Sequence, residues 1–99
     1  MALIRLAEYV KLTGQAMPRY FIDTSDGDTF VEDDEGHDLP CVEAARDAAQ
    51  SALPDMARDA MPDGDGRIFC ASVRDEVGTV LYKATLSLVG EWGAGQKPC

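Results

Sequence analysis

One long stretch of helical periodicity, residues 39–61, constrains the fold of this chain more than any other feature. Its apolar side chains recur at steps of three and four, which places them on one face of an α-helix. That face is rich in alanine, so the helix can lie close against a flat sheet. Its members are Val42, Ala45, Ala49, Leu53, Met56, Ala57 and Ala60.

The same helix has two weak points. Pro54 lies in its interior, where it removes a backbone donor and crowds the carbonyl of Gln50, at a cost of roughly 3 kcal/mol. We expect a kink at Pro54 or a break into two shorter helices. Cys41 takes the N-cap position, where Asp or Ser would cap better. The helix ends before Pro62 and the glycines that follow it.

Strand-like segments stand in pairs on either side of the helix. Residues 19–24 and 29–32 flank an Asp-Gly turn, and residues 68–75 and 80–89 flank the turn at 76–79. Both later segments alternate. Phe69, Ala71 and Val73 form one apolar row, and a second row comprises Val80, Tyr82, Ala84, Leu86 and Leu88.

The order ββαββ predicts an α+β fold. Its four-stranded antiparallel sheet would carry the main helix on one face. The other face is only partly polar, which makes it a candidate dimer surface.

The chain divides into three parts. Residues 17–89 are predicted to form a single domain, and residues 90–99, with three glycines, a flexible tail. Trp92 in this tail has the alternative of folding back onto the sheet. Residues 1–16 are either a helical arm or the product of a misplaced start site, because Met17-Pro18 itself resembles a protein start.

Charge and composition exclude several classes of protein. The net charge of -9, from 18 acidic and 9 basic residues, opposes binding to nucleic acid, which needs clustered Lys and Arg. No apolar run is long enough to span a membrane, and Arg5, Glu8 and Lys11 interrupt any signal-peptide core. The three widely spaced cysteines suit neither a disulfide framework nor a zinc site. We therefore predict a cytoplasmic protein.

Two acidic segments have features of metal sites. Asp33, Asp34, Glu35 and His37 form a cluster with the donor atoms for a hard cation, but such turns are usually solvated. Residues 63–68 resemble the middle of a calcium-binding loop, yet two of its ligand positions would be Met61 and Ser72. A turn is the favoured interpretation of both, so no metal or cofactor site is predicted.

The sequence gives similarly weak signals for a nucleophilic site and for RNA binding. Cys41 and His37 pair a thiol with a base, but no third residue orients them. A narrower hypothesis is that Cys41 is a reactive thiol at a helix N-terminus. Tyr20 and Phe21 suggest an aromatic RNA platform, which the acidic charge opposes, so core packing is favoured. No catalytic residue is predicted.

A series of landmarks carries a family resemblance. They are Met17-Pro18-Arg19-Tyr20-Phe21, Asp26-Gly27, Asp34-Glu35-Gly36, Leu39-Pro40, Glu43-Ala44-Ala45-Arg46, Val73-Arg74-Asp75-Glu76 and Gly78. Their order resembles DUF6894, a family of short alphaproteobacterial and rhizobial domains of unknown function. The resemblance covers about residues 17–89. In that family the residue after Leu-Pro is often acidic, whereas this chain has Cys41. The family implies no activity and no site residues.

A looser resemblance is to HicB-type antitoxins, which share a strand hairpin, a helix after a Leu-Pro-like turn and further strands. They usually add a C-terminal DNA-binding segment, and the tail here has only Lys97 as a basic residue. The sequence is therefore compatible with three functions. The first is a non-catalytic protein-interaction module that binds itself or another protein. The second is an antitoxin-like module with a basic protein partner. The third is a small metal-dependent enzyme, which chelation or His37→Ala would inactivate.

Overall fold

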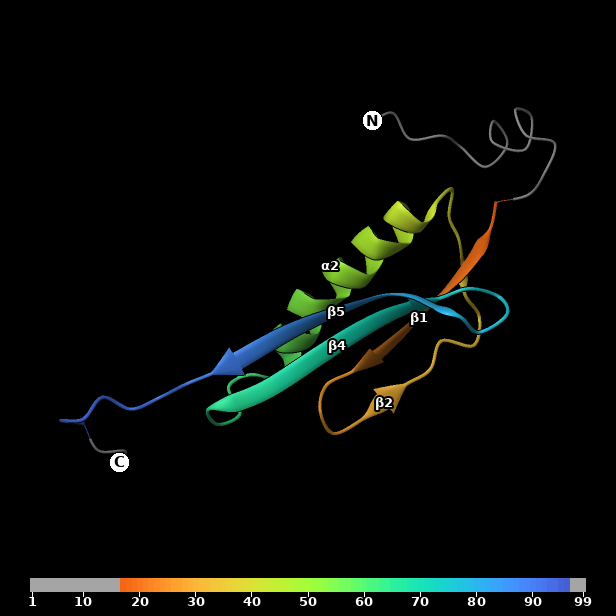
Figure 1. Ribbon diagram of the computed structural model, residues 1–99. Coiled ribbons are helices and arrows are strands. Elements are labelled where there is room, and N and C mark those ends of the chain that lie inside the picture. Colours follow the sequence, from red (N-terminus) through yellow and green to blue (C-terminus); the bar gives the residue numbers. More distant parts are fainter. Residues whose placement is uncertain (1–16, 97–99) are drawn as a thin grey trace.

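One helix packs on one face of an antiparallel sheet in the computed structural model, which describes residues 17–96 (Figure 1). The helix is α2 (Val42–Ala60). The strands are β1 (Arg19–Ser25), β2 (Phe30–Val31), β3 (His37–Asp38), β4 (Gly66–Arg74) and β5 (Val80–Val89). The predicted α+β fold is confirmed, and the strand and helix bounds lie close to those expected, except that β2 is shorter.

Five strands fill four positions in the sheet. The order is β2-β1-β4-β5, and β3 also pairs with β1. Strand β2 pairs with the end of β1 at Thr24 and Ser25, and β3 pairs with its start at Arg19 and Tyr20. Residues 32–36 leave the sheet edge between these two short strands. The sequence predicted four strands and missed β3, whose two polar residues show no strand pattern.

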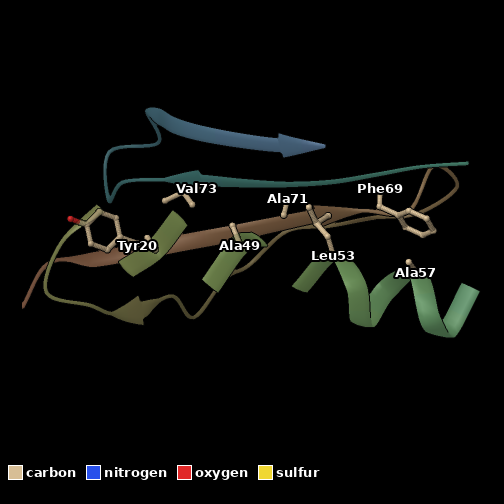
Figure 2. Close-up of a cluster of buried hydrophobic side chains, with 8 residues drawn as sticks. Tyr20, Ala49, Leu53, Ala57, Phe69, Ala71 and Val73 are labelled. Carbon is tan, nitrogen blue, oxygen red and sulfur yellow. The ribbon is translucent and has the colours of Figure 1, made fainter. Parts of the chain in front are cut away.

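The core lies between α2 and the middle of the sheet. Ala45 and Ala49 are fully buried, and their small side chains let the helix approach β4 closely. Figure 2 shows Tyr20 and Val73 toward one end of this core and Phe69 and Ala57 toward the other. The predicted helical face and the row Phe69, Ala71 and Val73 are therefore confirmed as core. The buried cluster comprises Tyr20, Ala45, Ala49, Leu53, Ala57, Phe69, Ala71 and Val73.

Helix α2 is continuous through Pro54, so the alternative of two shorter helices is wrong. Pro54 lies on the exposed side of the helix, where water can reach the carbonyl that loses its partner. The weak start is as expected, because Cys41 occupies the N-cap without a side-chain hydrogen bond to the helix. At the other end, the amide of Met61 donates to the carbonyl of Ala57 over 2.9 Å.

An irregularity between β4 and β5 corrects one predicted face. Val73 pairs with Tyr82, but Arg74 pairs with Val80, so Leu81 is an extra residue on β5. The bulge moves Val80 to the face away from the helix, where 62% of it is exposed. The expectation that Val80 belongs to the apolar row of β5 is wrong, because that expectation assumed unbroken alternation.

The segment after β5, residues 90–96, adds little to the core. Trp92 is 57% exposed and is not among the residues of the buried cluster or packed against it. The predicted N-terminal extension, residues 1–16, lies outside the described residues. Within residues 17–96 no helix combines the length and apolar character needed to cross a membrane.

Candidate protein-interaction surface

The sheet face opposite α2, called the open face below, carries no helix. Its side chains alternate with those of the core, so strand register assigns them. The face mixes apolar, hydroxyl and charged groups. Its residues are Phe21, Asp23 and Ser25 from β1, Ile68, Cys70, Ser72 and Arg74 from β4, and Val80, Lys83, Thr85 and Ser87 from β5.

Arg74 holds one end of the open face together. Its Nε lies 2.8 Å from Oδ2 of Asp23, and its Nη2 donates to the carbonyl of Asp33 over 2.7 Å. A further ion pair joins Nη2 to Glu32 at 3.3 Å, and the guanidinium stacks 4.7 Å from the ring centre of Phe21. The hydrogen bond from Arg74 to Asp23 raises the pKa of the guanidinium above its usual value.

Asp23 is the one buried charged residue among those described, with 7% of it exposed. Besides Arg74, its carboxylate accepts a hydrogen bond from the amide of Asp33 over 2.9 Å. A buried carboxylate is tolerated only when its oxygens are paired in this way. The pair therefore fastens the 32–36 loop to the open face.

In the gap between β2 and β3, the carboxylate of Asp33 accepts a backbone hydrogen bond from β1 that a pairing strand would otherwise accept. Its Oδ2 accepts from the amide of Ile22 at 3.1 Å, and its Oδ1 accepts from the amides of Glu35 and Gly36. Burial alone would raise the pKa of Asp33, but the three amide donors and the nearby His37 outweigh it and lower that pKa. The carboxylate is therefore held in its ionised form as a structural acceptor.

Gly36 closes the same loop. Its φ of +78° lies in the left-handed region, which residues with a Cβ seldom adopt. An added Cβ would also lie 2.8 Å from Cγ of Arg19 and 3.0 Å from Cε1 of Phe21. Arg19 cannot easily move away, because it pairs with Asp38 and donates to the carbonyl of Glu35. The Asp-Glu-Gly landmark is therefore a structural element of this edge.

A second arginine gathers carboxylates at the opposite end of the domain. The side chain of Arg67 is only 13% exposed and pairs with the carboxylates of Asp28, at 3.4 Å, and Asp63. It also donates to the backbone carbonyl of Asp26 over 3.0 Å. The amides of Thr29 and Asp28 lower the pKa of Asp26 by donating to its carboxylate. This cluster joins the β1–β2 turn to the loop after α2.

The two edges of the sheet differ strongly. The β2/β3 edge is broken by the 32–36 loop, and residues 26–38 contain seven of the 18 acidic side chains. Acidic groups, short strands and interruptions all hinder pairing with another strand. The β5 edge is one strand of ten residues, regular from Tyr82 onward after the bulge at Leu81, with no carboxylate, no proline and a single charge at Lys83. It is therefore the one edge of this sheet that is open to another strand.

The backbone of β5 shows which peptide groups face outward. The amide of Gly90 donates to the carbonyl of Asp65 over 2.6 Å, so residue 90 faces β4. Successive residues of a strand face opposite edges. Even-numbered residues such as Ala84 and Leu86 therefore face β4, and Lys83, Thr85, Ser87 and Val89 present their amides and carbonyls outward. This row of peptide groups has no strand beside it within residues 17–96.

Apolar exposure concentrates near this edge. Nine large hydrophobic residues are exposed among those described, and four of them lie in β5: Val80, Leu81, Leu86 and Val89. A shallow hollow of about 330 Å³ on the open face adjoins the strand and is lined in part by Phe30, Cys70, Val80 and Lys83. The unpaired edge, the exposed apolar side chains and the hollow all lie at or beside β5. This strand is therefore the candidate interaction surface.

The residues weighed for chemistry from the sequence do not converge on one site. His37 lies 3.3 Å from the carboxylate of Asp33, which already accepts hydrogen bonds from backbone amides. The side chains of Asp34 and Glu35 are exposed. Asp63 is paired with Arg67, and the loop after it runs into β4, as a turn would. No cluster of three metal-binding side chains occurs in the part of the chain that the structure describes.

The aromatic pair divides between the two faces of β1. Tyr20 is 9% exposed and belongs to the core, as the packing interpretation predicted. Phe21 lies on the open face under Arg74, outside the core, so the packing interpretation is wrong for this residue. The role of Asp23 and Arg74 was missed, although charges of opposite sign on two neighbouring strands are a usable signal for a cross-strand pair.

Comparison with known proteins identifies a family. A family model described as a domain of unknown function, DUF6894, matches residues 19–87, which is more than half of the chain. The resemblance predicted from the landmarks is thereby confirmed for that family. No curated protein and no solved structure matches this chain.

Proposed function

The chain belongs to the DUF6894 family, whose description assigns no activity, and we propose that it is a non-catalytic protein-interaction module that binds through β5. The observation that carries the proposal is the contrast between the two sheet edges. One is interrupted and acidic, and the other is a ten-residue strand with outward peptide groups and exposed apolar side chains.

Binding by strand addition suits this surface. A partner segment laid along β5 would pair with the outward peptide groups of Lys83, Thr85 and Ser87, and main-chain hydrogen bonds would supply affinity. Its side chains would meet Leu86 on the helix side and the hollow on the open face, which gives specificity. The partner is either another copy of the chain or a different protein.

The proposal is tested by capture from a lysate of the source cell. The bait is the full chain with Ser87→Lys, which places a second positive charge on the β5 edge, four residues along the strand from Lys83. The matched control is Ser51→Lys, which adds the same side chain on the exposed surface of α2. Wild type and control should retain a protein at near-equal amount, untagged copies of the chain included, and Ser87→Lys should lose it. Equal retention by all three baits would contradict the proposal.

An antitoxin-like module remains a second candidate, favoured by the acidic edge. The carboxylates of residues 26–38 offer a surface for a basic protein, and such binding should weaken as salt screens the charges. Partner release at high salt, from both the wild type and Ser87→Lys baits, would favour this candidate over binding through β5. Nucleic acid in the retained material would oppose both, since the chain carries a net charge of -9.

A further inference from the structure

We propose that the occupant of β5 is a second copy of the chain, paired antiparallel about a two-fold axis that passes beside Thr85. The inference rests on the proposed interaction function and names its partner. The result would be a continuous sheet of two domains, with both α2 helices on one face. Five arguments lead to this arrangement: the closed geometry, the strand register, the position of Lys83, the absence of carboxylates from β5 and the small core.

Pairing of β5 with itself closes as a two-fold dimer. Pairing β5 with the β2/β3 edge of another copy is head-to-tail, so it would form a larger ring or an open filament. That edge is also broken by the 32–36 loop and crowded with carboxylates. An antiparallel pair of identical strands uses the same surface on both copies and leaves only the acidic, protected edges at its ends.

The register of the two β5 strands follows from which side chains would lie opposite one another. Directly opposed residues lie on the same face of the sheet, so the axis must pass beside a residue and not between two. With Thr85 opposite its own copy, Leu81 lies opposite Val89, Tyr82 opposite Leu88, and Ala84 opposite Leu86. Apolar residues then meet apolar residues at every one of these positions. On the helix side, Leu86, which is 39% exposed, fills the space beside the small Ala84 of the other copy.

Alternative registers sort the side chains less well. An axis beside Ala84 places Leu81 opposite Ser87 and Lys83 opposite Thr85. An axis two residues earlier than Thr85, beside Lys83, places two ammonium groups in direct opposition, which destabilises a strand pair. With the axis beside Thr85, Lys83 lies opposite Ser87, and the polar residues also meet polar residues.

The charge of the chain favours contact at β5. Two copies, each with a net charge of -9, repel one another, so a stable contact must use a surface without carboxylates. Strand β5 is such a surface. Salt screens this repulsion, so added salt should strengthen the dimer, whereas it should release a basic protein partner.

The small core gives a reason for association. Among residues 17–96, only Phe69 and Val73 are large side chains that are fully buried, and four of the eight core residues are alanine. A domain of this size buries only about 60% of its unfolded surface, so burial of exposed apolar groups of β5 adds stability that the monomer lacks.

Two substitutions that add the same charge should act in opposite directions. Thr85→Glu places two carboxylates against each other at the axis and should weaken the dimer by roughly tenfold or more. Ser87→Glu places each carboxylate opposite Lys83 of the other copy and should tighten the dimer by roughly fivefold. Both positions are exposed, so neither variant should impair folding of the domain.

The experiment is sedimentation of the purified full chain over a range of concentrations, at low and at high salt. The expected result is a wild-type dimer that salt strengthens, a weaker Thr85→Glu dimer and a tighter Ser87→Glu dimer. Equal weakening by both variants would overturn the register, and a wild-type monomer at all concentrations would overturn the second copy as occupant. If the wild-type chain is a monomer but captures a protein that the Ser87→Lys bait does not capture, the proposed interaction function would stand without the dimer.

Discussion

Nε of Arg74 lies 2.8 Å from Oδ2 of Asp23, which pairs adjacent strands β1 and β4 through oppositely charged side chains on the open face. The two residues are 51 positions apart in the sequence. Around this pair the chain orders the 32–36 loop, because Arg74 and Asp23 both bond to the backbone of Asp33. The protected edge of the sheet therefore depends on one enclosed ion pair.

Asp23→Ala should destabilise the domain by roughly 3 kcal/mol. The substitution removes the partner of Arg74 and leaves the amide of Asp33 without its acceptor. Urea unfolding measures the change. Asp55→Ala serves as control, since Asp55 and its partner Arg58 are exposed and the pair contributes less than about 1 kcal/mol. A similar effect from both variants would contradict the role given to Asp23.

Acid should weaken the fold through Asp33. Its pKa is lowered in the folded protein, so its contribution to stability is fully present above the unfolded pKa, about 4. That contribution is lost as the pH falls below 4 through the folded pKa. Asp33→Asn removes this titration, so the unfolding free energy of the variant should depend less steeply on pH below 4 than that of the wild type. Parallel curves for wild type and variant would show that Asp33 is not held as an ion.

Gly36→Ala and Gly64→Ala form a matched pair. Both glycines have a positive φ, +78° and +76°, but only Gly36 has neighbours within 4 Å of an added Cβ. Gly64→Ala should cost about 1 kcal/mol from backbone strain alone. Gly36→Ala should cost more, by at least about 1 kcal/mol, because Arg19 and Phe21 must shift. Thermal unfolding compares the stability of the two variants. Equal losses of stability would mean that Arg19 and Phe21 shift away from the added Cβ at no cost in free energy.

Pro54→Ala should stabilise the domain by about 2 kcal/mol. Alanine restores the amide that helix α2 lacks at this position and removes the crowding of Gln50, although it also frees the unfolded chain. The exposed position makes a packing penalty small. Asp59→Ala, another exposed helix position, is the control and should change stability by about 0.5 kcal/mol at most. A destabilised Pro54→Ala variant would show that the ring has a packing role.

Local pattern was sufficient for the helix and the core. The spacing of Ala45, Ala49 and Leu53 defines one helical face, and the alternation of Phe69 and Val73 defines the strand row that it covers. Both signals arise from burial along a single element. They were read correctly because nothing outside the element changes their period.

Features set by contacts between elements were not predictable in the same way. The bulge at Leu81 reverses the face of Val80, and it depends on how β4 and β5 pair. Strand β3 exists because Arg19 and Tyr20 of β1 pair with it, and His37 and Asp38 show no strand preference of their own. Outward peptide groups of β5 follow from the sheet order, which composition and periodicity leave open.

Amide hydrogen exchange along β5 tests most directly whether this edge is paired. Ala84 and Leu86 bond to β4 and are internal controls that should be protected at every concentration. The amides of Lys83, Thr85 and Ser87 should become protected as the concentration of the wild-type chain rises, and Thr85→Glu should abolish that gain. Exchange of these three amides at the rate of exposed loop residues, at all concentrations, would contradict the pairing of β5 with a second copy.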